Sequence, residues 1–274
     1  MAPDADTALS PHKIQALLRT ETLGRTLHVF ENVDSTNRAA LVLAGAETPD
    51  GTVVIAETQT AGRGRLGRVW HSPSGDNLYC SILLRGVRAS EHLSAWLCWL
   101  PLVTGSGVLS AIRTATGLEP VLKWPNDVLV RDRKVAGVLC ETAGVGTACA
   151  WVVVGIGVNV NTLRDQFPSE LSESATSLAS ELGRRLSRVE LLATMLKELE
   201  SRYAEITSTI PLSITQEYTA LCSTLGRLVR VSLSSGEVIE GVADSLTTAG
   251  ALSVIQADTG RSRRIHAGDV VHVR

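Results

Sequence analysis

A run of 20 residues without a charged side chain, Leu93 to Ile112, constrains the fold more than any other segment. A stretch of that length could cross a lipid bilayer. However, Pro101, Gly105 and Gly107 interrupt it, and it also contains serine and threonine. We therefore predict a helix buried on both sides inside a globular protein, with no membrane partner. The 274-residue chain is long enough for one large domain or two unequal ones.

Hydrophobic periodicity predicts short strands and helices along the first 222 residues. Strands are predicted over 26–33, 52–57, 78–84, 127–130, 135–141 and 148–160. Helices are predicted after Ser10, after 34–37, after Ser187 and over 215–222. After Leu225 the pattern changes to short strands over 227–233, 238–242, 252–255 and 270–273. Closely spaced strands with polar turns are typical of a small β-barrel, so we expect one domain over 1–222 and another over 223–274.

Charge and cysteine content exclude several classes of protein. The net charge is -2, so the chain has no overall attraction to nucleic acid or to an acidic membrane. Five cysteines are scattered through apolar segments without a CxxC pair, which argues against a disulfide framework or a zinc site. The N-terminal residues, Met1 to Asp6, lack the basic and apolar pattern of a signal peptide. We expect a cytoplasmic protein.

The segment from Gly62 to Trp70 carries the strongest chemical signal, with three glycines and three arginines in its first seven residues. Glycine lets successive backbone N–H groups approach an anion, and arginine supplies paired donors for phosphate or carboxylate. A solvated surface loop and an RNA contact remain open readings of this segment. The Walker A pattern and a GxGxxG after a strand are both absent from the sequence. Repulsion among the arginines predicts a loop that stays mobile until an anion binds.

Three further segments carry chemistry less specifically. Lys123 lies between apolar residues in Lys-Trp-Pro-Asn-Asp, and a partly buried ammonium needs a counter-anion. Lys134 precedes a strand that includes Gly137, and Gly155 to Asn161 combines glycines with asparagines near a strand end. Each of these segments taken singly is also compatible with a purely structural role.

Taken together and in this order, the motifs resemble the biotin protein ligase family. The segments that carry the resemblance are Ser35 to Asn37, Gln59 to Trp70, Lys123 to Asp127, Lys134 to Leu139, and Gly155 to Asn159. It covers the chain from about Thr26 to the C-terminus. The resemblance implies a mixed, largely antiparallel sheet packed with helices, followed by a small SH3-like β-barrel.

The resemblance also implies roles for individual residues. Lys123 and Arg65 would be catalytic. Biotin would be bound by Ser35, Thr36, Asn37, Gln59, Gly62, Arg63, Gly64, Arg65, Lys123 and Gly137. ATP and the adenylate would be bound by Arg63, Arg65, Arg68, Trp70, Asn126, Lys134 and Asn159. A urea ring offers one carbonyl and two N–H groups, which small polar side chains can satisfy. No metal ligand can be assigned.

The implied reaction has two steps. The biotin carboxylate attacks the α-phosphorus of Mg²⁺-ATP, giving biotinyl-5′-AMP and pyrophosphate. A lysine of a biotin carboxyl carrier protein, from acetyl-CoA carboxylase or a related enzyme, then attacks the mixed anhydride. No enzyme nucleophile is needed, and the sequence shows no GxSxG motif. We expect a monomer or a weak homodimer.

The sequence departs from the family pattern in two respects, and two alternative functions remain open. Only about 25 residues precede the first predicted strand, so we expect the monofunctional form, without the N-terminal helix-turn-helix of members that bind DNA. Val138 stands where isoleucine is commonest in the family, which changes one methylene. A lipoate or octanoate ligase or transferase of the related fold is one alternative. A nucleic-acid-binding module using the Gly/Arg loop is the other, and the net charge opposes it.

Overall fold

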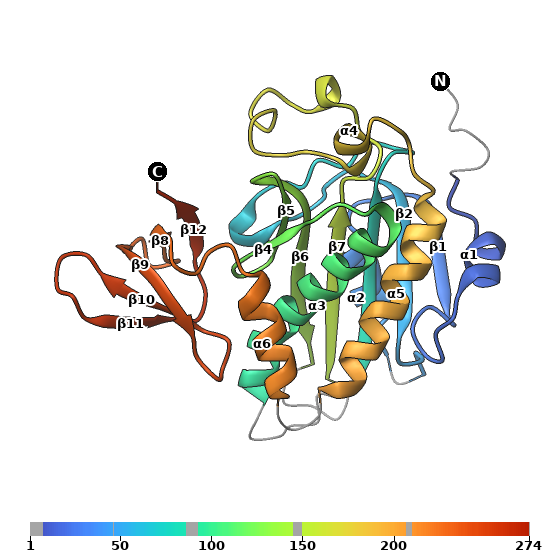
Figure 1. Ribbon diagram of the computed structural model, residues 1–274. Helices are drawn as coiled ribbons and strands as arrows, with labels where there is room; N and C mark the ends of the chain where they lie inside the picture. The colour runs from blue at the N-terminus through green and yellow to red at the C-terminus, as the bar shows by residue number, and fades with distance from the viewer. Residues whose placement is uncertain (1–7, 46, 86–92, 145–149, 207–209, 274) are drawn as a thin grey trace.

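The computed structural model of the chain describes residues 8–45, 47–85, 93–144, 150–206 and 210–273 (Figure 1). The N-terminal segment from Met1 to Asp6 and Cys149, both considered above, lie outside these residues. The described chain forms a large sheet covered by helices and a smaller sheet beside it.

The large sheet has seven strands in the order β1-β2-β3-β7-β6-β5-β4. Their bounds are β1 Leu27–Val33, β2 Thr52–Gln59, β3 Leu78–Arg85, β4 Val121–Lys123, β5 Asp127–Val130, β6 Arg133–Ala143 and β7 Trp151–Val158. Only β1 and β2 pair in parallel, and the other neighbours are antiparallel. The predicted mixed, largely antiparallel sheet is therefore confirmed. β4 was not predicted, because three residues are too few to show a period.

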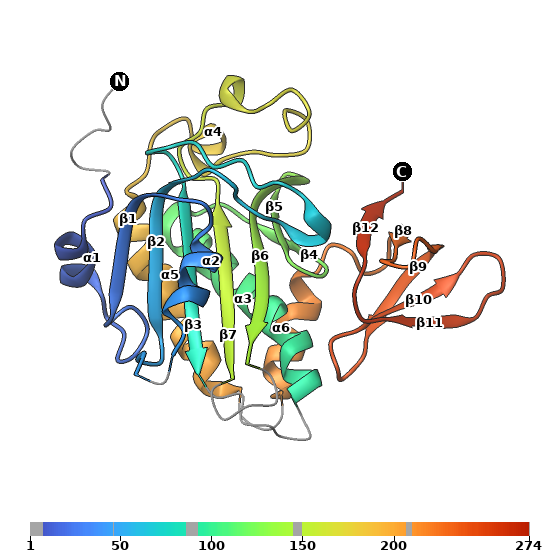
Figure 2. The same cartoon turned by 180° about the vertical axis from the view of Figure 1, so that it is seen from behind.

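Helices cover both faces of this sheet. α1 (Pro11–Leu17), α3 (Leu93–Thr116), α5 (Arg188–Glu205) and α6 (Leu212–Leu221) lie on one side, and α2 (Thr36–Leu43) lies on the other (Figure 2). The alternation of β2 explains this arrangement: Val53 and Ile55 join the core of the large face, whereas Val54 packs beneath α2. α4 (Leu178–Leu182) is a short helix at one end of the sheet. α1 begins directly after Ser10, as predicted, and ends at Leu17.

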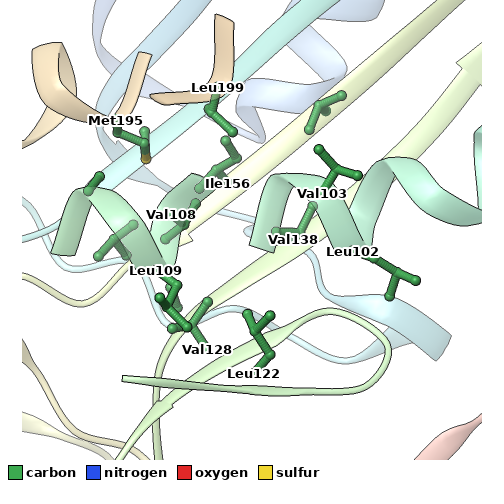
Figure 3. Packing of buried hydrophobic residues seen from close by; sticks show 14 of the residues in the cluster. Leu102, Val103, Val108, Leu109, Leu122, Val128, Val138, Ile156, Met195 and Leu199 are labelled. Carbon is green, nitrogen blue, oxygen red and sulfur yellow. The ribbon is translucent and has the colours of Figure 1, made fainter. Parts of the chain in front are cut away.

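α3 is the charge-free helix. Its window from Leu97 to Thr116 is long and apolar enough to cross a membrane, but 67% of that window is buried inside the protein. Val103, Val108 and Leu109 pack among side chains of the sheet and of α5 (Figure 3). The prediction of a buried helix is confirmed, and this helix is the centre of the main hydrophobic core.

The smaller sheet has five antiparallel strands in the order β11-β10-β9-β8-β12. Their bounds are β8 Leu228–Ser232, β9 Val238–Leu246, β10 Leu252–Gln256, β11 Ser262–Ile265 and β12 Asp269–His272. β11 was not predicted, because its four residues include two arginines. Among the described residues its edge strands β11 and β12 do not pair with each other, so the sheet is open where a closed barrel was expected.

Hydrogen bonds join the smaller sheet to the larger part of the chain. Trp124 Nε1 donates to the Gly250 carbonyl at 3.1 Å, and Trp99 Nε1 donates to the Thr248 carbonyl at 2.8 Å. Both carbonyls lie in the turn between β9 and β10. The predicted boundary at 222/223 falls between α6 and β8 and stays a prediction.

Candidate active site

A single cavity of about 640 Å³ collects nearly all of the residues singled out by the sequence. Its volume lies within the usual range for small-molecule sites. The predicted residues that line it are Ser35, Thr36, Asn37, Gln59, Arg63, Gly64, Arg65, Arg68, Trp70, Lys123, Asn126, Lys134, Gly137 and Asn159. Gly62 is not among the lining residues. A Cβ at Gly62 would lie 2.6 Å from both Ser72 Oγ and the Trp70 carbonyl oxygen, so this glycine allows the loop's two arms to approach.

One end of the cavity is a cluster of small polar side chains at the start of α2. The Thr36 backbone N–H donates to Gln59 Oε1 at 2.9 Å, and Gln59 Nε2 donates to Ser72 Oγ at 3.0 Å. Asn37 Nδ2 lies 3.2 Å from the Leu139 carbonyl and 2.7 Å from Glu141 Oε2, so its amide spans from α2 to β6. These contacts hold hydrogen-bond donors and acceptors of α2, β2 and β6 around one end of the cavity.

Ser81 completes this polar cluster from β3. Its hydroxyl lies 2.6 Å from Asn37 Oδ1 and 2.8 Å from Thr36 Oγ1, and all three side chains are buried. Gly155 on the neighbouring strand β7 leaves room for Asn37, because a Cβ there would collide with the Asn37 amide. Ser81 was not predicted, since it belongs to no motif and reaches the site only through the register of β3 with β7.

The Gly/Arg loop folds back on itself as a tight hairpin. Arg63 and Val69 form an isolated antiparallel bridge, and the Trp70 N–H donates to the Gly62 carbonyl at 2.9 Å. At its tip Leu66 and Gly67 have φ angles of 55° and 74°, which is a left-handed turn.

Each of the three loop arginines has its own partner. Arg63 pairs with Glu141 at 3.0 Å, and Arg68 pairs with Asp269 at 2.5 Å. Arg65 donates to Asn126 Oδ1 at 3.2 Å and more weakly to the Gly268 carbonyl at 3.4 Å. Besides burial, Arg68 also lowers the pKa of Arg65, as like charges do, while the hairpin directs each guanidinium to a different neighbour. That the loop stays mobile until an anion binds remains a prediction.

Trp70 lies over a part of the sheet where two adjacent strands carry glycine. Gly137 of β6 and Gly157 of β7 are register partners, and a Cβ on Gly157 would lie 2.5 Å from the indole. Lys134 Nζ lies 5.2 Å from the centre of the ring, within range of a cation–π attraction. Trp70 Nε1 is buried without a hydrogen-bond partner among the described residues. A buried, unpartnered donor in a cavity is suited to a ligand acceptor.

Two lysines line the cavity. Lys134 Nζ is 2.6 Å from Asp127 Oδ1. The side chain of Lys123 has no hydrogen-bond or ion-pair partner in the part of the chain that the structure describes. Burial lowers the pKa of Lys123, and the nearby Asp127 and Asp269 carboxylates oppose that shift. Burial likewise lowers the pKa of Arg65. Partly desolvated cations without full compensation attract an anionic ligand strongly.

The two predicted asparagines connect loops to the sheet. Asn126 Nδ2 donates to the Val138 carbonyl at 2.9 Å, while its Oδ1 accepts from Arg65. Asn159 Nδ2 donates to the Thr176 carbonyl at 3.0 Å and so holds the segment before α4 against the end of β7. Both side chains line the cavity; Asn126 uses both polar atoms of its amide in these contacts, and Asn159 uses its Nδ2.

The C-terminal sheet supplies a third wall that the sequence did not predict. Arg227, Leu228 and the segment from Gly268 to Val273 line the same cavity. His272 Nδ1 lies 3.4 Å from Arg227 Nη1, and its Nε2 lies 3.2 Å from Thr224 Oγ1. Since an arginine can only donate, Nδ1 accepts and the proton is on Nε2. Burial and the nearby Lys123 and Arg227 lower the pKa of His272 to about 4, so this ring is neutral at pH 7.

The arrangement joins two kinds of chemistry in one enclosed space. The polar cluster around Thr36, Asn37 and Gln59 suits a neutral ring with donors and an acceptor. The cations Lys123, Lys134, Arg65 and Arg68 suit carboxylate and phosphate oxygens. Such a cavity can hold a carboxylic acid against a nucleotide phosphate and stabilise the charge that develops between them.

Comparison with known proteins places these features in a family. The model of the biotin/lipoate A/B protein ligase family matches residues 29–159. The biotin–[acetyl-CoA-carboxylase] ligase of Mycobacterium tuberculosis is 36% identical over 97% of this chain and 98% of its own length. The bifunctional ligase/repressor BirA of Bacillus subtilis is also 36% identical, over 72% of this chain. There the match spans 59% of the length of the bifunctional protein.

Solved structures agree. The biotin protein ligase of Aquifex aeolicus in complex with biotin and ATP has a TM-score of 0.76 and 31% identity, covering 91% of this chain and 99% of that one. Its coverage extends over both the helix-covered sheet and the C-terminal part, so the likeness concerns the whole architecture.

Proposed function

Because this chain belongs to the biotin protein ligase family, we propose that it activates biotin with ATP and transfers it to a lysine of an acceptor protein. The observation that carries the proposal is the continuity of the polar cluster with the cationic cluster in one cavity. A ligand that fits both ends must be neutral and hydrogen-bonding at one end and anionic at the other. Biotinyl-5′-AMP has this character.

We assign the ureido ring to the cluster of Thr36, Asn37 and Gln59. Gln59 and Asn37 each use an oxygen and a nitrogen in this cluster, so they can rotate or exchange partners to meet a carbonyl and two N–H groups. Ser81 fixes the orientation of Asn37.

We assign the reacting carboxylate and α-phosphate to the space beside Lys123. The ammonium of Lys123 has no partner in the described part of the chain, so it can contact both anions without breaking an existing ion pair. Arg65 is the second catalytic residue, and it is held toward the cavity by Asn126. Both residues would stabilise negative charge on the α-phosphate as the carboxylate attacks.

The remaining residues that line the cavity are assigned to the nucleotide. Trp70 offers an aromatic face and an unpartnered Nε1–H, and Lys134 can exchange Asp127 for a phosphate oxygen. Magnesium would enter with ATP. It keeps several water ligands and takes one or two carboxylates. Asp127, which already lines the cavity, fits that requirement.

The acceptor is proposed to be the biotin carboxyl carrier domain of acetyl-CoA carboxylase, by analogy with the M. tuberculosis and Paracoccus denitrificans ligases that match this chain. We further propose a cytoplasmic protein that binds no specific DNA and is a monomer or weak homodimer. The strand order, in which the last strand of the smaller sheet pairs with the first, supports an SH3-like fold for that part.

The test of this proposal measures both half-reactions. Purified protein with biotin and Mg²⁺-ATP should catalyse biotin-dependent exchange of pyrophosphate into ATP, and adding the carrier domain should biotinylate it. Controls omit ATP or replace the target lysine of the carrier by arginine. Octanoate and lipoate are offered in parallel: activation of these acids but not of biotin would replace the proposal by a lipoate ligase.

A further inference from the structure

A row of exposed apolar side chains crosses the smaller sheet and ends at the mouth of the active-site cavity. Leu228 of β8 pairs with Val242 of β9, which pairs with Ile255 of β10. Partners across an antiparallel sheet share one face, so the three side chains lie side by side. Their exposed fractions are 43%, 42% and 39%. We call these three residues the apolar row.

The apolar row is continuous with the cavity itself. Leu228 lines the cavity, and so do Val271 of the neighbouring edge strand β12 and Val273, which follows that strand. The Val273 N–H donates to the Leu228 carbonyl at 2.9 Å, which extends the row by one residue towards the large sheet. Figure 1 shows β8 and β12 on the side of the smaller sheet that faces β4.

The surface beside the row carries one ion pair and one further carboxylate, that of the exposed Asp244 two residues after Val242. Arg230 and Glu240 form the next cross-strand pair on the same face and bind each other at 2.6 Å. Val271, 52% exposed, is the register partner of Arg230. The face therefore offers apolar contact area to a partner, with charged side chains only at its border.

We propose that this face, centred on the apolar row, docks the acceptor protein during transfer of biotin. The inference rests on the proposed function, because that reaction needs a protein substrate at this cavity. A lysine side chain reaches only about 6 Å from its Cα. The body of the acceptor must therefore rest on the cavity mouth, where Leu228 and Val271 are exposed.

The size of a protein interface brings the rest of the row into contact. Adjacent strands are about 4.8 Å apart, so Val242 lies about 5 Å and Ile255 about 10 Å beyond Leu228. A specific interface covers about 800 Å² on each partner, or about 30 Å across. An interface centred on the mouth thus includes the whole row. The acceptor that fits carries its lysine on a protruding turn with apolar residues around it.

The test uses Val242→Glu, which places a charge in the row without touching the cavity lining. Ile255→Glu is the second variant, and Leu212→Glu on α6 is the matched control, since Leu212 is exposed but lies on another surface. Far-UV circular dichroism and thermal melting verify that each variant folds. Three rates are measured on the full-length protein: pyrophosphate exchange, transfer to the carrier domain, and transfer to hydroxylamine, a small nucleophile that needs no docking.

We expect both row variants to raise the KM for the carrier domain by about tenfold or more, as loss of one apolar anchor does in protein interfaces. Pyrophosphate exchange and hydroxamate formation should match those of the wild type, and Leu212→Glu should change none of the three. Carrier KM values within twofold of wild type in both variants would overturn the inference. So would a change of the wild-type sedimentation coefficient in Val242→Glu with transfer unaffected, which would assign the face to a second copy of the chain. Absence of pyrophosphate exchange in the wild type would instead reject the proposed function.

Discussion

Arg68 in the Gly/Arg loop is bound by Asp269 of β12, with 2.5 Å between Nη2 and Oδ2. The ligand loop of the large sheet is thereby attached to the C-terminal sheet. Burial lowers the pKa values of Lys123 and Arg65, and Asp269 lies close enough to both to oppose that shift. A carboxylate of the protein thus stands among the cations proposed to receive the carboxylate and phosphates of the ligands, and an incoming anion competes with it.

The loop attachment leads to a proteolysis prediction. Trypsin should cleave after Arg65 or Arg68 faster in Asp269→Asn than in the wild type, because an amide no longer holds the guanidinium by charge. Biotin with ATP should slow cleavage in both proteins, since the adenylate offers the arginines stronger acceptors and orders the loop. ATP alone should protect less. Mass spectrometry of the fragments identifies the bonds cut. Equal cleavage rates with and without ligands would mean that the loop is not a ligand clamp.

Lys123→Ala should abolish adenylate formation while leaving the fold intact. Removing one donor that stabilises developing charge typically lowers the rate by about 100-fold to 1,000-fold. Biotin-dependent pyrophosphate release is the measurement, and Lys197→Ala on the exposed side of α5 is the control. A rate within a few-fold of wild type would return Lys123 to a structural role.

Gly157→Ala should impair ATP use through Trp70. The new Cβ would lie 2.5 Å from the indole, which must then leave its place over β6 and β7. We expect the KM for ATP to rise about tenfold, the loss of one stacking or packing contact. Gly45→Ala, where the nearest atoms are 3.9 Å away, is the matched control. The double variant with Trp70→Ala should be no worse than Trp70→Ala alone; additive losses would contradict this explanation.

The fully buried Arg188 should be among the most important single residues for stability. Its guanidinium binds Glu57 at 2.7 Å and the Asn77 carbonyl at 3.1 Å. Arg188→Met leaves Glu57 unpaired in a largely buried site, and breaking such a pair typically costs about 3–5 kcal/mol. Arg230→Met breaks the exposed pair with Glu240 and should cost less than about 1 kcal/mol. Urea denaturation of the two variants gives the comparison, and equal losses would contradict it.

Acid should destabilise the protein partly through His272. Its pKa is about 4 in the folded protein and 6.5 as the ordinary value, so the unfolded chain binds more protons between these limits. The stability that the neutral His272 ring contributes is therefore fully present above pH 6.5 and is lost as the pH falls towards 4. In His272→Asn, the free energy of unfolding should therefore fall less steeply over that window than in the wild type. Parallel curves of unfolding free energy against pH for the two proteins would show that His272 is not responsible.

Local patterns predicted the parts of the site that lie within one motif. Lys123, Asn126 and Lys134 could be named because the order of their motifs resembles the biotin protein ligase family, although each motif taken singly also fitted a structural role. The sequence predicted only some of the residues at the polar end of the cavity. Ser81 reaches Asn37 through the pairing of β3 with β7, and no spacing in the sequence records that register.

The C-terminal wall could not be predicted for a different reason. Asp269 and Leu228 come to the cavity through the docking of one sheet against another, which depends on contacts such as that of Trp124 with Gly250. Sequence periodicity did predict short strands there, but it contains no information on which face meets the catalytic sheet. The open edge between β11 and β12 was missed likewise, because strand number and strand closure are separate properties.

The paired glycines Gly137 and Gly157 have a consequence for the height of the ligand space over the sheet. The space above them is filled by Trp70 and Lys134, because a Cβ at Gly157 would lie 2.5 Å from the indole and a Cβ at Gly137 would lie 2.9 Å from the Lys134 side chain. Two absent side chains on adjacent strands thus let a large ring settle directly on the backbone of the sheet. The depth at which the indole rests, and with it the height of the space left for a ligand, is set by these two glycines.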